Sequence, residues 1–225
     1  MVFKFWRGGS TEPLERVQDK VRAMLQHDRH EFDLAMSALL GDVDPASVNA
    51  ELRATDQKVN RLEREIRREL VVHASVFGGI DSPSVLVYMS VVKDIERVGD
   101  YAKNLLDLAR DGANLHGVPD VDEWRKHAAE LSAFIPAAGE VYYAGDRARG
   151  QELRARGDLL LRQFDDRVRA LVRGDDQGPQ AVSRALAYRY LKRVLAHLMN
   201  LVSAVIMPVD QLDYFDEDPE DRLAP

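Results

Sequence analysis

The chain has 225 residues and contains no cysteine. This absence excludes a disulfide framework, an iron–sulfur cluster held by thiolates and a cysteine nucleophile, and it favours a reducing, cytoplasmic setting. Aromatic residues make up only 7% of the chain, whereas charged residues make up 31%. Because strands are enriched in aromatic and β-branched residues, this balance favours a charged helical protein over an all-β one.

The chain also lacks a long hydrophobic run. Its most apolar stretch, 198–209, is interrupted by polar residues and a proline, and it is much shorter than the ~20 residues that a membrane-spanning helix needs. The first seven residues carry Phe3, Phe5 and Trp6 but no apolar run of signal-peptide length. These aromatics are expected to pack on the chain's own core or, as the alternative, to touch a membrane surface. The sequence therefore predicts no membrane insertion.

Proline and glycine positions divide the chain into six segments. Capping residues followed by proline indicate helix starts, and glycines indicate helix ends. Between them, apolar residues recur every three or four positions, as in amphipathic helices. Asp120 with Glu123 predicts an acidic capping box, and Pro136 predicts a kink in the same helix. The short links predict an all-α bundle of antiparallel neighbours, with helices at 13–40, 45–77, 83–111, 120–144, 147–173 and 179–207.

The two halves of the chain are similar in sequence. Residues 51–56 resemble residues 152–158, and residues 95–98 align with residues 191–194. A repeat of about 100 residues is too long for a solenoid unit. It predicts two tandem three-helix bundles, at 1–115 and 116–208, followed by a tail at 209–225.

The net charge of −7 is concentrated in that tail. After Val209 the chain has seven acidic residues and a single arginine, so the tail accounts for −6 of the −7. We therefore expect a flexible acidic tail on a nearly neutral body. Since no recognition motif accompanies this charge pattern, nucleic acid is not a predicted partner.

Carboxylates lie along one edge of the second and third predicted helices. At about 100° per residue, Asp56 and Glu63 border the apolar stripe of one helix, and Glu96 and Asp100 border that of the next. Packing of these helices would bring the four carboxylates toward one seam. Like charges so close repel each other unless a cation lies between them, and carboxylate oxygens suit Mg²⁺, Mn²⁺, Ca²⁺ or iron. The four residues are our candidate metal ligands.

A simpler interpretation needs no metal. Carboxylates four residues apart are common on solvated helices, where Lys93, Arg97 or Arg67 could neutralise them. Gly99, within the same stretch, costs a helix up to ~1 kcal/mol relative to alanine. Its presence predicts the close approach of a neighbouring helix.

No catalytic residue is predicted. Ferritin-like di-metal enzymes need Glu-x-x-His on two helices, and no glutamate here has a histidine three residues later. No serine lies in a glycine elbow, and no glycine-rich loop could cradle a phosphate. The arginines of 61–68 alternate with glutamates, which predicts an ion-paired face or, as the minority interpretation, a partner surface.

Residues 93–105, with the sequence KDIERVGDYAKNL, resemble the signature helix of the PhoU family of phosphate-uptake regulators. That family's hallmark is an E(D)xxxD motif, which Glu96 and Asp100 match. The resemblance extends in length, helix order and repeat over nearly the whole chain. The alternative is a carboxylate-rich metal-binding or scaffold protein with no link to phosphate.

The resemblance implies a cytoplasmic, all-α regulator that is often a homodimer. It implies partners, namely the ATPase of a phosphate-specific ABC transporter and a sensor histidine kinase of a two-component system. It implies negative regulation, in which phosphate uptake and the phosphate-starvation response are restrained when phosphate is plentiful. It further implies metal ions, such as Fe, Zn, Mn or Mg, at the carboxylate motifs.

The second repeat departs from the family pattern. Lys192 and Ala196 replace the two motif carboxylates, and Arg162 stands where the first repeat has an asparagine. We hypothesise that Lys192 and Arg162 neutralise Asp158 and Asp165, so that only the first repeat binds metal.

Overall fold

The computed structural model describes residues 12–77, 81–176 and 178–212. Within them the chain forms six long helices and two short 3₁₀ turns, with no strand, which confirms the all-α prediction. The long helices are α2 (Glu12–Leu39), α3 (Pro45–Phe77), α4 (Ser82–Arg110), α5 (Val121–Ala144), α6 (Arg147–Arg173) and α7 (Ala181–Ile206). The 3₁₀ turns are η2 (Leu115–Gly117) and η3 (Val209–Gln211).

The predicted helix boundaries agree with the observed ones to within two residues. The predicted stops at Gly41, Gly112, Gly145 and Gly174 all have positive φ, which costs glycine little because it has no Cβ. The start of α6 is also as predicted, since Asp146 accepts a hydrogen bond from the backbone N–H of Arg149. Helix α5 continues through Pro136, and the kink predicted there stays a prediction.

Helix α7 begins two residues later than predicted. Gln180 precedes it with a left-handed φ of 58°. The Gln180 side chain exchanges two hydrogen bonds with the backbone of Asn114, at 2.9 and 2.7 Å. These bonds hold Gln180 in a conformation that non-glycine residues rarely adopt, and they delay the first helical turn.

The predicted capping box at α5 is wrong. Asp120 precedes the helix, but its carboxylate makes no capping hydrogen bond. It instead accepts a hydrogen bond from the buried guanidinium of Arg184, at 2.9 Å. Glu123 is likewise engaged elsewhere, in an ion pair with Arg167. A charged partner on another helix competes successfully with a local cap because it offers a stronger, charge-assisted bond.

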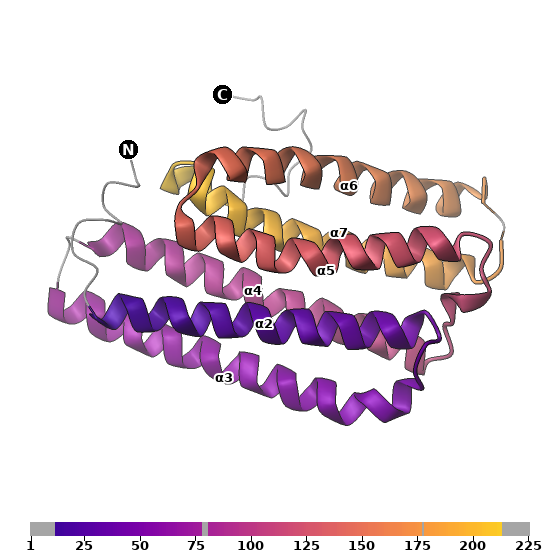
Figure 1. Ribbon diagram of the computed structural model, residues 1–225, viewed down its shortest axis with the longest axis horizontal. Helices are drawn as coiled ribbons and strands as arrows, with labels where there is room; N and C mark the ends of the chain where they lie inside the picture. Colours follow the sequence, from indigo (N-terminus) through magenta and orange to yellow (C-terminus); the bar gives the residue numbers. More distant parts are fainter. Residues whose placement is uncertain (1–11, 78–80, 177, 213–225) are drawn as a thin grey trace.

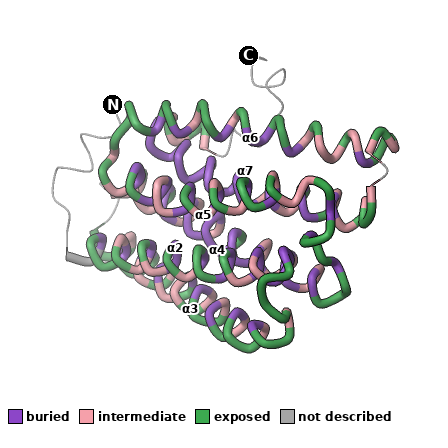
Figure 2. Tube along the Cα trace, turned by 45° about the vertical axis from the view of Figure 1, so that its right-hand side comes forward, coloured by how far each residue is buried: buried purple, intermediate pink, exposed green. Residues whose placement is uncertain are grey.

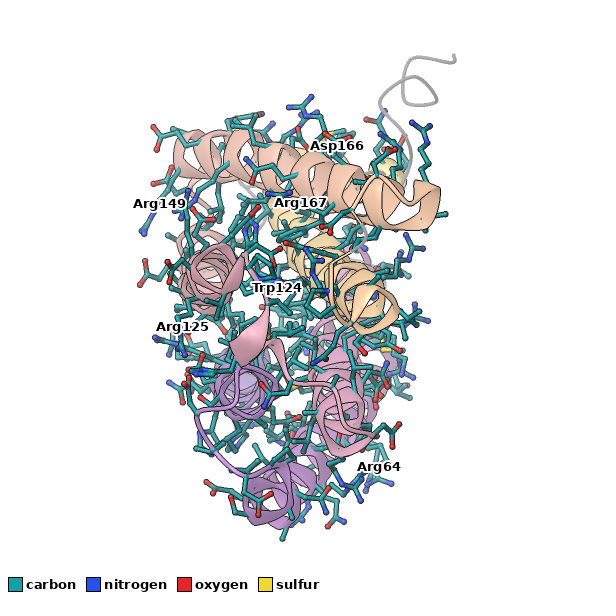
Figure 3. The ribbon with its side chains drawn as sticks, turned by 90° about the vertical axis from the view of Figure 1, so that its right-hand side faces the viewer. Arg64, Trp124, Arg125, Arg149, Asp166 and Arg167 are labelled. Atoms are coloured by element: carbon teal, nitrogen blue, oxygen red, sulfur yellow. The ribbon has the colours of Figure 1, made fainter. Side chains whose placement is uncertain are left out.

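The helices lie side by side along the long axis of the molecule, in a stack with α3 at one edge and α6 at the other (Figure 1). Between these edges, α2 and α4 pack against α5 and α7, as the end-on view also shows (Figure 3). In that view Arg64 of α3 lies at one extreme and Arg167 of α6 toward the other. The predicted division at residue 115 falls in the link between α4 and α5.

One hydrophobic core runs through both halves. Buried residues line the inner sides of all the helices, whereas the outer sides of α3 and α6 are largely exposed (Figure 2). Trp124, with 0% exposure, anchors the second half against Tyr188. Where α4 meets α7, buried Asp94 accepts hydrogen bonds from His197 and Asn200, at 2.8 and 2.9 Å. This polar contact joins the two halves at a fixed register.

None of the helices in the described part of the chain is long and apolar enough to cross a membrane. The aromatics Phe3, Phe5 and Trp6 and the acidic tail beyond Leu212 lie outside the described residues.

Candidate functional site: the carboxylate seam of α2, α3 and α4

The four predicted ligands lie on the helices expected to carry them. Asp56 and Glu63 are on α3, and Glu96 and Asp100 are on α4. Glu63 and Glu96 are buried, and Asp56 and Asp100 are partly buried. The two helices contact each other and both contact α2, and we call this junction the carboxylate seam.

Lys103 lies at the centre of the outer part of this seam. Its ammonium group is 2.7 Å from Asp56 Oδ1 and 2.8 Å from Asp100 Oδ1. Burial alone would lower the pKa of Lys103, but the hydrogen bonds to Asp100 and Asp56 outweigh burial and raise this pKa above its ordinary value. The chain's own cation therefore bridges two of the predicted ligands.

The other two predicted ligands also have cationic partners. Lys93 Nζ is 2.5 Å from Glu96 Oε2, and an Arg67 nitrogen is 3.1 Å from Glu63 Oε1. Of the three cations that the metal-free interpretation named, Lys93 and Arg67 make these ion pairs, and no ion pair of Arg97 is observed in the described part of the chain.

Two carboxylates that the sequence interpretation missed lie deeper in the seam. Asp28 and Glu31, both on α2, have 0% exposure. Among the described residues, none of their four carboxylate oxygens has a hydrogen-bond partner. A buried, unpaired carboxylate is among the most unfavourable groups that a protein core can hold. The structure around these two residues provides no hydrogen-bond donor or cation for their carboxylate oxygens among the described residues.

Gly99 faces these two carboxylates from α4. A Cβ on Gly99 would lie 3.1 Å from Asp28 Oδ1 and 3.2 Å from Glu31 Oε2. The prediction that Gly99 permits a close approach is confirmed, and the approaching groups are carboxylates. Asp28 and Glu31 therefore both lie next to Gly99, which is within the stretch 93–105 that resembles the PhoU signature helix.

The surroundings raise the pKa values of both carboxyl groups. Burial raises the pKa of Asp28 well above its ordinary value, and the charges of Glu31 and Glu96 add to that effect. Burial also raises the pKa of Glu31 to about 8, with Asp56 and Asp100 contributing and Lys103 opposing. Near neutral pH, the inner seam therefore favours a proton or another cation.

A sequence signal for these residues was present. Within α2 the buried positions Val21, Met24, Asp28, Glu31 and Ala35 recur with steps of three and four. Two acidic residues thus occupy core positions of an apolar stripe, where polar residues are exceptional unless functional. The sequence interpretation considered the acidic residues of the two following helices only.

The donor chemistry fits a hard cation, although the side chains are not gathered around one. Asp28 and Glu31 offer buried, unpartnered oxygens of the type that Mg²⁺, Mn²⁺ or iron prefers. Within 12–77, 81–176 and 178–212, no three Asp, Glu or His side chains converge as a ready metal site. Lys103 already supplies the positive charge between Asp56 and Asp100.

The corresponding seam of the second half contains an internal ion pair. Lys192 Nζ lies 2.8 Å from Asp165 Oδ2, which confirms one half of our neutralisation hypothesis. The other half is not observed in the described part of the chain, because Asp158 lies 3.9 Å from Arg154, and Arg162 is exposed.

Comparison with known proteins identifies relatives of this chain. The family model for the PhoU domain matches residues 21–109, which cover most of α2, α3 and α4. The chain is 25% identical over 210 residues to the "Phosphate-specific transport system accessory protein PhoU homolog" of Pseudomonas aeruginosa, covering 89% of this chain and 85% of that protein. The protein of the same description from Deinococcus radiodurans is 26% identical over 171 residues, covering 71% and 78%.

A solved structure shares the fold. The crystal structure of PhoU from Pseudomonas aeruginosa superposes with a TM-score of 0.76 and 22% sequence identity, covering 86% of this chain and 95% of that one. The PhoU homolog 1 of Thermotoga maritima is 34% identical over 99 residues, covering 44% of this chain and 34% of that protein.

Proposed function

The chain belongs to the PhoU family, and on this premise we propose that it is an accessory protein that regulates phosphate transport. One observation carries the proposal. The PhoU domain match, residues 21–109, covers most of the three helices that form the carboxylate seam. The relatives named above are accessory proteins of phosphate-specific transport systems.

We further propose the direction of this regulation and the partners. The protein acts in the cytoplasm as a homodimer, with the transporter ATPase and a sensor histidine kinase, and restrains uptake and starvation signalling when phosphate is plentiful. Such a role needs contact surfaces and no catalytic group. The alternative, a metal-binding scaffold unrelated to phosphate, would leave phosphate physiology unaffected by loss of the protein.

Deletion of the gene tests the regulatory role. In high phosphate, the deletion strain is expected to take up labelled phosphate several-fold faster than the parent and to express phosphate-starvation genes. Reintroduction of the wild-type gene should restore both readouts. Unchanged uptake together with unchanged repression would refute the regulatory proposal and favour the scaffold.

We also propose that the first seam binds a divalent or iron-type cation. The oxygen ligands would come from Asp28, Glu31, Glu96 and Asp100. Asp56 would become available as a further ligand once Lys103 moved away from it. Together with Glu63, these residues include all four ligands predicted from the sequence. A bound cation would supply positive charge where the buried carboxylates have no partner.

Metal content of the purified protein tests this site. The Glu96→Ala/Asp100→Ala variant is expected to retain less than half of the metal found in the wild type, measured by elemental mass spectrometry after dialysis. Asp158→Ala/Asp165→Ala in the second seam is the matched control and should retain the wild-type content. Equal metal content in wild type and the Glu96/Asp100 variant would contradict a first-seam site.

A further inference from the structure

A groove at the C-terminal end of α3 exposes apolar side chains. Val72, Val76 and Phe77 are 62%, 68% and 43% exposed, and they line a groove of about 220 Å³ together with Arg16 of α2. Adjacent exposed apolar side chains of this kind indicate a contact surface. The groove is smaller than the roughly 300–1,000 Å³ typical of small-molecule sites, so its size suits a few side chains of a polypeptide.

The groove has an ordered floor. The Phe77 ring stacks on the ring of His73 at 4.6 Å, and His73 Nε2 lies 2.9 Å from Asp81 Oδ2. Arg16 and Arg68 line the groove beside Glu69, whose Oε1 accepts a hydrogen bond from Lys20. The surface thus offers an apolar strip flanked by charged side chains.

We propose that residues 2–7 of the same chain cover this groove. This segment contains Phe3, Phe5 and Trp6, the most concentrated aromatic cluster in the sequence. Aromatic side chains bury large apolar areas, so the composition of the segment complements the exposed apolar side chains of the groove.

The chain length permits this contact. Trp6 precedes Glu12, the first described residue, by six positions, which an extended chain spans with up to about 20 Å. Arg16, which lines the groove, lies only about 6 Å along α2 from Glu12, at 1.5 Å per residue. Gly8 and Gly9 lie between the aromatics and the helix, and their conformational freedom permits the chain to reverse direction.

Tryptophan fluorescence can detect this contact because the chain has two tryptophans and the other, Trp124, is fully buried. The Trp6→Phe variant gives the Trp124 signal, and subtraction from wild type gives Trp6. We expect acrylamide to quench Trp6 several-fold more efficiently in Val76→Asp than in wild type. Val172→Asp, at a position 76% exposed on α6, is the matched control and should leave Trp6 shielded.

Further measurements identify the occupant. An unchanged Trp124 emission in Val76→Asp/Trp6→Phe shows that the fold is intact, and Val72→Asp provides a second disruption of the groove. Efficient quenching of Trp6 already in wild type would overturn the proposal. Shielding that disappears on dilution would instead assign the segment to a second copy of the chain, and shielding that requires anionic vesicles would assign it to a membrane. Each of these two results also contradicts the proposal.

Discussion

The Asp28→Asn/Glu31→Gln variant is expected to be more stable than the wild type at pH 8 and to lose much of the wild type's dependence on pH. Both carboxyl groups are fully buried, and none of their oxygens has a hydrogen-bond partner among the described residues. Replacement by amides removes two groups whose ionisation the core opposes. The measurement is urea unfolding from pH 5 to pH 9 in a buffer that contains a metal chelator.

The sign follows from the raised pKa values. Glu31 has a pKa of about 8 in the folded chain against an ordinary 4.5, so the unfolded chain releases this proton first as the pH rises. The penalty on the folded state is absent below pH 4.5, grows above it and is complete above pH 8. Between pH 6 and pH 8, Glu31 alone should lower the free energy of unfolding by roughly 2 kcal/mol, at ~1.4 kcal/mol per proton and pH unit. Asp28, whose pKa is raised for the same reason, acts in the same direction.

Asp33→Asn is the matched control. Asp33 lies on the same helix but is exposed, and its replacement should change stability by less than about 0.5 kcal/mol. If the double variant were as pH-sensitive as the wild type, the buried carboxyl groups would not be the source of the effect. A stabilised variant would indicate that the seam is retained at a cost in stability, as expected of a functional site.

Arg184→Ala is expected to lower the free energy of unfolding by about 3 kcal/mol, toward the lower end of the range for breaking a buried ion pair. The guanidinium of Arg184 is 3% exposed and lies 2.9 Å from Asp120 and 2.6 Å from Asp176. Its loss leaves the carboxylate of Asp120, only 17% exposed, without its cation. The melting temperature should fall by roughly 6–12 °C for a chain of this length.

A second and a third variant separate charge from packing. Arg189→Ala, on the exposed side of the same helix, should change the melting temperature by no more than ~2 °C. Adding Asp120→Asn to the Arg184 variant should recover part of the loss, because the unpaired charge is then removed. No recovery would mean that Arg184 acts through its packing alone, and a melting temperature equal to the wild type's would contradict the ion-pair argument.

The sequence alone located the helices because their boundaries depend on local chemistry. Glycines at positive φ and the Asp146 cap act within a few residues, so proximity in the sequence was sufficient to find them. The capping box at Asp120 failed because its competitor, Arg184, lies 64 residues away. The late start of α7 has the same origin, since Asn114 lies 66 residues from Gln180.

The candidate site divides in the same way. The periodicity of α3 and α4 correctly placed Asp56, Glu63, Glu96 and Asp100 on facing helices. Pattern alone could not decide whether these carboxylates meet a metal or a lysine, because Lys103 can reach two helices only once they are packed.

The low aromatic content and the helical period of the apolar residues predicted an all-α chain, and the charge distribution located the acidic tail. These properties are sums over the sequence or depend on neighbours within one helical turn. The tertiary structure decided which charged groups have a partner of opposite charge and which are buried without one. It placed Asp28 and Glu31 in the core opposite Gly99, where the absence of water makes their ionisation unfavourable. Burial depends on contacts between distant parts of the chain, and for that reason only the folded structure revealed the inner half of the seam.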